Sequence, residues 1–122
     1  MSVNSPTYLI TGATDGIGRA TALALAERGA RVILHGRNPA KLEATVEQFR
    51  AATGNESLHP VLADFASLDQ VAALGQRVRS DFPGLIVLIN NAGLLTDHWQ
   101  RSADGFEMTF AVNYLAPFLL TQ

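Results

Sequence analysis

The clearest chemical pattern lies in the glycines of the segment Thr11 to Gly18, which reads T-G-A-T-D-G-I-G. A short apolar run, Tyr8 to Ile10, precedes this segment, and a helical pattern follows it. Gly12 allows a sharp turn off a strand, Gly16 allows close approach of the backbone to a phosphate, and Gly18 allows tight helix packing. A helix N-terminus also presents unpaired N–H groups and the positive end of a dipole to anions. The segment therefore predicts a site for the pyrophosphate of a dinucleotide, with contacts from Gly12, Thr14, Asp15, Gly16, Ile17 and Gly18.

The elements that must position this turn alternate as in a parallel sheet with crossover helices. Strands are expected at residues 8–10, 31–35, 58–63 and 85–89, and helices at residues 17–28, 39–53 and 67–81. Asn38 and Ser67 are candidate N-caps, and Gly29 and Gly54 are candidate helix ends. Ser67 and Gln70 also fit a capping box.

Two apolar patterns predict which surfaces are buried. Leu42, Val46 and Phe49 form a stripe at helical spacing. The run 85–89 is apolar at every position, so both faces of that strand are expected to be covered. The sequence thus predicts an α/β domain with helices on both sides of a sheet.

Composition excludes several classes of protein. The 122 residues are 48% hydrophobic, which suits one soluble α/β domain with its own core. A net charge of −2 favours neither nucleic acid nor an anionic membrane as a partner. The absence of cysteine excludes disulfides, thiolate metal sites and cysteine nucleophiles, and the three histidines lack a second ligand at metal spacing. A short polar segment at 1–6 and the lack of an apolar run of about 18 residues favour a cytoplasmic location.

The spacing of the glycines is specific. Three residues separate Gly12 from Gly16, whereas the general dinucleotide motif has one residue there. This T-G-x-x-x-G-I-G pattern, together with Asn90-Asn91-Ala92-Gly93 after the strand at 85–89 and Asn113 further on, resembles the short-chain dehydrogenase/reductase family over residues 7–122. The resemblance implies a Rossmann-like doubly wound sheet with the half-sheet order 3-2-1-4, and hydride transfer between a nicotinamide cofactor and a carbonyl or alcohol. An extended-type sugar epimerase is disfavoured, because that group usually has two residues between the first two glycines.

One part of the family pattern is missing. The catalytic Tyr and Lys of the family are separated by three residues, but the only lysine is Lys41 and no Tyr-x-x-x-Lys occurs. The chain therefore resembles the cofactor-binding half of the family fold, truncated before the catalytic Ser, Tyr and Lys, and we expect it to be inactive alone. Residues 118–122 stop inside a helical pattern without a capping glycine, which agrees with a partial chain. The alternative is a stand-alone nucleotide-binding or dimerising module without catalysis.

The end of the second strand bears on the choice of cofactor. Relatives that use NAD carry an acidic residue there for the ribose 2′-hydroxyl, but this chain has Gly36 followed by Arg37. An arginine can pair with a 2′-phosphate, so NADP(H) is favoured over NAD(H). Asp15 opposes this interpretation, because several NADP-using relatives carry a basic residue at its position and a carboxylate repels phosphate. Arg37 as a solvated loop charge is the alternative.

Two further segments resemble cofactor contacts of the family. Asp64 resembles the adenine-contacting aspartate, with the Phe65 N–H as a second contact; the alternative is local capping of a turn. The small residues Ala92 and Gly93, with Asn90, resemble the segment that passes close to the ribose and nicotinamide. An ordinary turn at the end of a sheet is the alternative there.

Asn113 is the one catalytic residue that the resemblance places in this chain. Pro117 has no N–H, so the Asn113 carbonyl four residues earlier loses its helical partner. In the family this carbonyl is held at a kink and binds a water that leads to the catalytic lysine. A simple proline kink is the alternative.

The last third of the chain carries two weaker expectations. Residues 104–121 resemble most the retinol-dehydrogenase and protochlorophyllide-reductase branch, which implies a small, lipophilic carbonyl or alcohol substrate. The helix expected over Phe106 to Leu120 is a candidate surface for homo-oligomers. Trp99 lies where family members border the substrate pocket, or it is a packing anchor.

Overall fold

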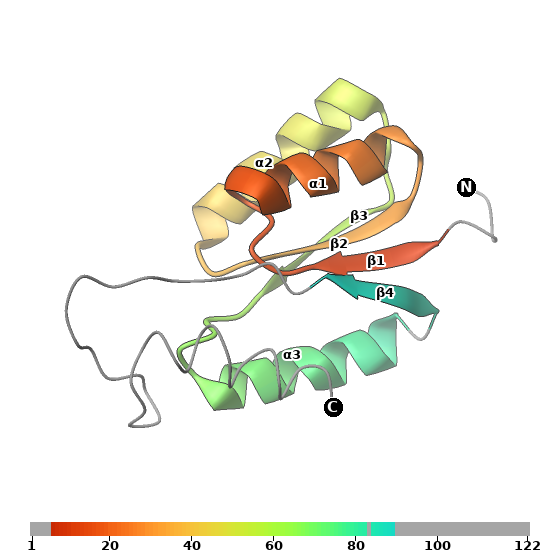
Figure 1. Ribbon diagram of the computed structural model, residues 1–122. Coiled ribbons are helices and arrows are strands. Elements are labelled where there is room, and N and C mark those ends of the chain that lie inside the picture. Colours follow the sequence, from red (N-terminus) through yellow and green to blue (C-terminus); the bar gives the residue numbers. More distant parts are fainter. Residues whose placement is uncertain (1–5, 83, 90–122) are drawn as a thin grey trace.

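A computed structural model describes residues 6–82 and 84–89, in which strands and helices alternate (Figure 1). The elements follow in the order β1 (Thr7–Ile10), α1 (Gly16–Glu27), β2 (Arg31–Gly36), α2 (Pro39–Thr53), β3 (Leu58–Leu62), α3 (Leu68–Asp81) and β4 (Leu85–Ile89). The strands and helices expected between residues 8 and 89 are therefore confirmed, with ends that shift by one residue at most of the boundaries. Within the described residues, no helix has the length and apolar character that a membrane crossing needs.

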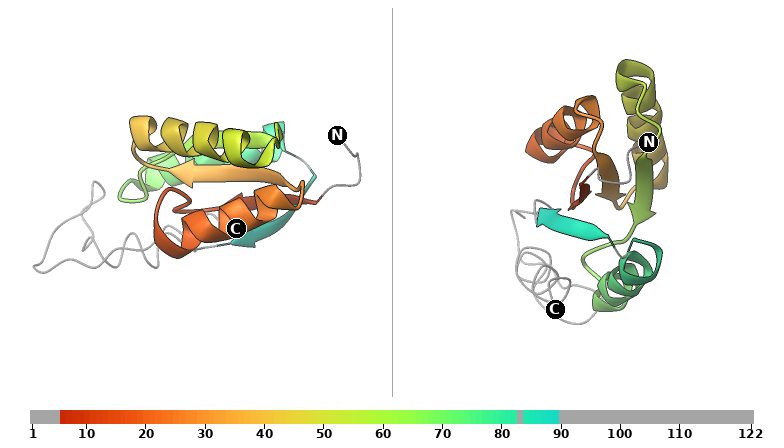
Figure 2. Two further views of the ribbon diagram at one scale, coloured as in Figure 1. Left: turned by 90° about the horizontal axis from the view of Figure 1, so that it is seen from above. Right: turned by 90° about the vertical axis from the view of Figure 1, so that its right-hand side faces the viewer.

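The four described strands form one parallel sheet in the order β3-β2-β1-β4, which confirms the predicted half-sheet. Each parallel pair requires a crossover connection, and here a helix supplies each one. Helices α1 and α2 cover one face of the sheet and α3 covers the other, as the views in Figure 2 show. The described part of the chain is thus a Rossmann-like doubly wound half-sheet.

Alternation along the strands divides the core into two layers. Leu9 of β1 and Ile33 of β2 face α3, whereas Ile10 and Leu34, one residue further on, face α1 and α2. Successive side chains of a strand point to opposite faces, so a strand covered on both sides is apolar throughout. The α3 layer contains Leu9, Ile33, Val61, Ala63, Phe65, Val71, Leu74, Val78 and Phe82. The other layer contains Ile10, Ala13, Ala22, Ala26, Ala30, Val32, Leu34, Leu42, Val46, Phe49 and Leu58.

The ends of α2 have the predicted chemistry. The Asn38 side chain accepts a hydrogen bond from the Lys41 N–H at 3.1 Å, and Pro39 occupies the first helical position. Gly54 ends the helix in the left-handed conformation, with φ +70°. Such a C-terminal glycine lets the chain reverse without the steric penalty of a side chain.

Of the two hydrogen bonds of the capping box predicted at α3, one is present and the other is not. Ser67 Oγ accepts from the Gln70 N–H at 3.4 Å, as expected of an N-cap. The Gln70 side chain, however, accepts from the Asp64 N–H at 2.7 Å, and the Ser67 N–H donates to the Asp64 carbonyl. The Gln70 side chain therefore bonds to the turn that follows β3. It does not bond to the Ser67 N–H, because that N–H already has a backbone acceptor.

One polar side chain forms hydrogen bonds to two other segments of the chain. Asn55, between α2 and β3, donates from Nδ2 to the carbonyls of Ala26 and Ala30 at 3.1 and 2.8 Å. Its Oδ1 accepts from the Ser57 N–H at 2.7 Å. The Asn55 amide thus links the segment between α1 and β2 to the segment that leads into β3.

Candidate functional site

The predicted phosphate-binding turn lies at the carboxyl edge of the sheet, where β1 passes into α1, on the left of Figure 1. Gly12 and Gly16 have φ +65° and +55°, and every described residue with positive φ is a glycine. A side chain at these two positions is strained, because L-residues rarely adopt this conformation. Gly18 is buried in α1. The conformations required by the glycine interpretation are present at all three positions.

Backbone hydrogen bonds hold this turn against the two neighbouring strands. The Ala13 N–H donates to the His35 carbonyl of β2 at 2.8 Å. The Thr11 N–H donates to the Ile89 carbonyl of β4 at 3.1 Å. The turn is therefore fixed from both sides before any ligand binds.

The first turn of α1 remains open to a ligand. A Cβ at Gly16 would meet no atom within 4 Å. Ile17, next to it, is 79% exposed, which is unusual for a large apolar side chain. The open space lies at a helix N-terminus, where N–H groups and the dipole favour an anion. These residues fit the pyrophosphate of a dinucleotide.

Asp15 is the N-cap of α1, but its side chain makes no capping hydrogen bond. Its Oδ2 lies 2.5 Å from Nζ of Lys41, in the first turn of α2. The hydrogen bond from Lys41 is the largest effect and lowers the pKa of the Asp15 carboxyl, while desolvation opposes it. The charge of Lys41, a hydrogen bond from Thr14 and the charge of Arg19 lower this pKa further. The carboxylate therefore points to α2 and does not occupy the N–H groups of α1.

The end of β2 is crowded. A Cβ at Gly36 would lie 3.0 Å from Thr14 Cγ2 and 3.4 Å from Leu42 Cδ1. Arg37, which follows, is exposed. A side chain at position 36 requires Thr14 to shift, so the acidic residue of NAD-using relatives has no ready space here.

The turn after β3 contains both residues predicted there, and Phe65 is linked to the glycine turn through His35. Asp64 Oδ1 accepts from the Ala66 N–H at 2.9 Å, which is the local turn given as the alternative. Phe65 is buried, and its ring stacks on the ring of His35 with centroids 4.3 Å apart. Asn90, Ala92, Gly93 and Asn113, and the helix expected at 106–120, lie outside the described residues.

Two residues at this edge were not singled out from the sequence. Lys41 was noted only as the sole lysine, and His35 only as one of three scattered histidines. Both act through contacts with residues 23 to 26 positions away in the chain, so no local spacing marks them. Among the described residues, no group of three metal-ligating side chains exists.

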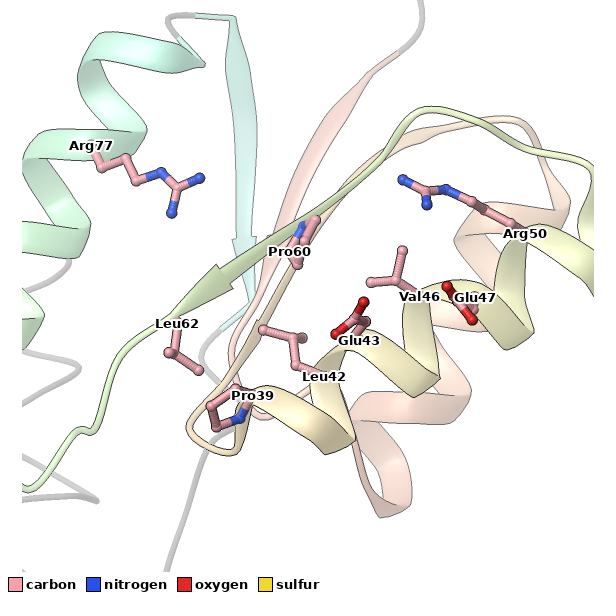
Figure 3. A pocket seen from close by; sticks show the side chains of 9 residues that line it. All are labelled: Pro39, Leu42, Glu43, Val46, Glu47, Arg50, Pro60, Leu62 and Arg77. Carbon is pink, nitrogen blue, oxygen red and sulfur yellow. The ribbon is translucent and has the colours of Figure 1, made fainter.

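A separate groove lies along the outer strand β3, between α2 and α3 (Figure 3). It has a volume of about 370 Å³ and is lined by Pro39, Leu42, Glu43, Val46, Glu47, Arg50, Pro60, Leu62 and Arg77. Arg50 already donates to the Leu58 carbonyl, and Arg77 pairs with Asp81. None of the predicted site residues lines this groove, so we do not assign the dinucleotide to it.

Comparison with known proteins shows the family of this chain. The model of the short chain dehydrogenase family matches residues 6–122. The chain belongs to this family. A candidate daunorubicin C-13 ketoreductase of Streptomyces sp. (strain C5) is 50% identical over 118 residues, which are 95% of this chain and 40% of that protein. Human retinol dehydrogenase 13 is 40% identical over 98% of this chain and 36% of its own length.

Solved structures of short-chain dehydrogenases share the fold. An alcohol dehydrogenase from Comamonas testosteroni, described as specific for bulky-bulky ketones, superposes with a TM-score of 0.83 at 30% identity, covering 98% of this chain and 48% of that one. A short-chain dehydrogenase from Sphingobium yanoikuyae in complex with NADPH gives a TM-score of 0.81 at 33% identity over 95% of this chain and 45% of that one. The chain thus spans less than half the length of these relatives.

Proposed function

We propose that this chain is the dinucleotide-binding half of an NADP(H)-dependent short-chain dehydrogenase/reductase that interconverts a carbonyl and an alcohol. The observation that carries the cofactor choice is the crowding at Gly36, where an added Cβ meets Thr14 at 3.0 Å. The exposed guanidinium of Arg37 follows directly and suits a 2′-phosphate. The Sphingobium relative with NADPH bound agrees with this choice.

The described residues bind the cofactor in separate parts. The turn from Gly12 to Gly18 holds the pyrophosphate, with Thr14 and Asp15 shaping the turn and Ile17 providing an apolar contact. Asp64 Oδ2 accepts from the adenine amine while Oδ1 keeps its bond to Ala66, and the Phe65 N–H is the second contact. Asn90, Ala92 and Gly93 pass close to the ribose and nicotinamide.

The pairing of Asp15 with Lys41 removes the main electrostatic objection to NADP(H). A lone carboxylate in the glycine turn repels a phosphate. The ammonium of Lys41, 2.5 Å away, compensates that charge and adds a cation on the side of α2 where Arg37 stands. Lys41 and Arg37 thus place two cations on the side of the glycine turn where Asp15 lies.

The chemistry of the complete protein follows from these assignments. The bound nicotinamide supplies or accepts the hydride at the carbonyl carbon. The Asn113 carbonyl, released by Pro117, holds a water that leads to the catalytic lysine. That lysine, the Tyr that acts as general acid/base and the Ser belong to the part of the family fold that this chain does not cover.

The substrate we propose is a lipophilic carbonyl or alcohol. This rests on the relatives that carry the names retinol dehydrogenase and polyprenol dehydrogenase, and on the ketoreductase relative. Self-association through residues 106–120 is a further proposal. Size-exclusion chromatography of the protein and of a Phe106→Glu variant tests it, since a charge there is expected to shift a dimer to a monomer.

Titration of the protein with NADPH and with NADH, followed by nicotinamide fluorescence, tests the function. We expect saturable binding with NADPH at least about 10-fold tighter, the order expected of a charged hydrogen bond to the 2′-phosphate. In the Arg37→Ala variant the two affinities are expected to converge. Equal binding of both cofactors to the unaltered protein contradicts the cofactor choice, and binding of neither contradicts the site.

A further inference from the structure

His35 lies between two segments of the proposed cofactor site. Gly12 N–H donates to its Nδ1 at 3.0 Å, and its Nε2 lies 2.8 Å from the Ala63 carbonyl. We propose that His35 is a positioning residue: its neutral ring fixes the glycine turn to the carboxyl end of β3, and protonation of the ring lowers affinity for the dinucleotide. This inference rests on the proposed function.

The two hydrogen bonds define one form of the ring. Nδ1 accepts from a backbone N–H, so it carries no proton, and Nε2 therefore carries the proton that it donates to the Ala63 carbonyl. The ring is 4% exposed and stacks on Phe65 with an interplanar angle of 21°. The side chain thus has one orientation and one tautomer, set by the backbone of two loops.

Protonation conflicts with this arrangement. Both nitrogens of an imidazolium are donors, so Nδ1–H would face the Gly12 N–H. The two donors repel, and the first glycine of the phosphate-binding turn must move away from β2. Because the pyrophosphate contacts depend on that turn, protonation of His35 lowers the affinity for the cofactor.

The charges around His35 set how readily it protonates. Asp64 after β3 is the charged group that acts on His35. The surrounding elements also carry Asp15 in the glycine turn, Arg31 and Arg37 on β2 and after it, Lys41 in α2 and Asp69 in the first turn of α3. Burial is the largest effect and lowers the pKa of His35, while the Ala63 carbonyl and Asp64 raise it in part. The neutral ring is therefore the form present near neutral pH.

Three substitutions separate the two hydrogen bonds. In His35→Asn, the amide oxygen stands near the place of Nδ1 and can accept from Gly12, but nothing reaches Ala63. In His35→Gln, the longer amide stands near the place of Nε2 and can donate to Ala63. His35→Phe keeps the stack on Phe65 and removes both bonds.

The measurement is the affinity of the protein, in its natural full length, for NADP⁺ by calorimetry between about pH 8 and about pH 5, the range in which histidine titrates. We expect His35→Asn to bind at pH 8 within about two-fold of the unaltered protein, and His35→Phe to bind about 10-fold more weakly. On acidification the unaltered protein is expected to lose about five-fold more affinity than His35→Asn. The 2′-phosphate also titrates, near pH 6, but equally in all the variants.

The outcomes separate this inference from the proposed function. A larger acid loss for the unaltered protein than for His35→Asn supports the positioning role. Coincident pH profiles of these two proteins overturn it, whatever His35→Phe does, including failure of that variant to fold by circular dichroism. If the unaltered protein binds no dinucleotide at pH 8, the proposed function itself is overturned, and this inference with it.

Discussion

Lys41 Nζ lies 2.5 Å from Asp15 Oδ2, so the first turn of α2 is joined to the glycine turn before α1. The two side chains are 52% and 69% exposed. An exposed pair of this kind contributes little to stability and is screened by salt. Its effect is on the local potential, because it decides which charge meets an anion at the end of β2.

Substituting the two partners is expected to move NADPH affinity in opposite directions. Lys41→Ala leaves the Asp15 charge uncompensated and weakens NADPH binding about two- to five-fold, while Asp15→Asn leaves the ammonium uncompensated and tightens it by a similar factor. NADH, which lacks the 2′-phosphate, is the matched control and changes less. Fluorescence titration at low and moderate salt checks this, and parallel changes for NADPH and NADH contradict it.

Gly36→Asp is expected to remove the preference for NADPH. The new carboxylate repels the 2′-phosphate, and the added Cβ meets Thr14 Cγ2 at 3.0 Å. NADPH affinity should fall about 10-fold or more, the order of a lost charged hydrogen bond. Gly36→Ala has the added Cβ alone, and Gly36→Asn has nearly the shape of Asp without its charge, so the difference between the Asp and Asn variants reports the effect of the charge. An unchanged ratio of NADPH to NADH affinity in Gly36→Asp argues against the assignment of this position.

Gly16→Ala and Gly29→Ala form a matched pair. Both glycines have positive φ, +55° and +77°, and a Cβ at either meets nothing within 4 Å. Each substitution is therefore expected to cost about 1 kcal/mol of unfolding free energy from backbone strain alone. Only Gly16→Ala should also weaken dinucleotide binding, because its methyl group enters the phosphate site. Urea denaturation and cofactor titration give the two readouts; equal binding by both variants contradicts the placement of the pyrophosphate.

Asn55→Ala is expected to destabilise the fold without touching the site. The substitution removes the donors to the Ala26 and Ala30 carbonyls and the acceptor for Ser57 N–H. At about 1 kcal/mol for each net hydrogen bond, the free energy of unfolding should fall by about 2–3 kcal/mol. Asn55→Asp keeps only the acceptor and places a second oxygen against two carbonyls, so it should be no more stable than the alanine variant. If urea denaturation of Asn55→Ala shows a loss of unfolding free energy below about 0.5 kcal/mol, the stabilising role of these three hydrogen bonds is contradicted.

Stability is expected to fall on mild acidification. Burial lowers the pKa of His35, and burial with the charges of Arg31 and Arg50 lowers the pKa of His59, both from 6.5. Below about pH 6.5 the unfolded chain therefore binds more protons than the folded protein. The free energy of unfolding is not reduced by these histidines above that pH, and it decreases as the pH falls toward the lowered pKa values of the folded state. The thermal midpoint of the unaltered protein should drop more between about pH 7.5 and 5.5 than that of a His35→Asn, His59→Gln variant. Equal drops would show that these rings do not carry the acid sensitivity.

Local patterns in the sequence determine most of the elements described. The apolar runs of β1, β2 and β3 and the boundaries at Asn38, Ser67, Gly29 and Gly54 depend on residues within a few positions of one another, so they can be recognised without the tertiary structure. The glycine turn is similar, since Gly12 and Gly16 are needed by the conformation of their own backbone. The strand order followed from the family resemblance and is confirmed.

Side-chain partners across the sheet edge were determined only by the tertiary structure. Gln70 was expected to cap its own helix, but its side chain bonds to the turn after β3, because the tertiary structure places the Asp64 N–H within hydrogen-bonding distance of it. Lys41 meets Asp15, and His35 meets Gly12 and Ala63, across separations of more than 20 residues. The sequence by itself determined that a glycine turn follows the first strand and which glycines form it. The parallel sheet decided what surrounds that turn, because it brings the carboxyl ends of distant strands to one edge. There His35 bonds to Gly12 and Ala63, and Lys41 bonds to Asp15.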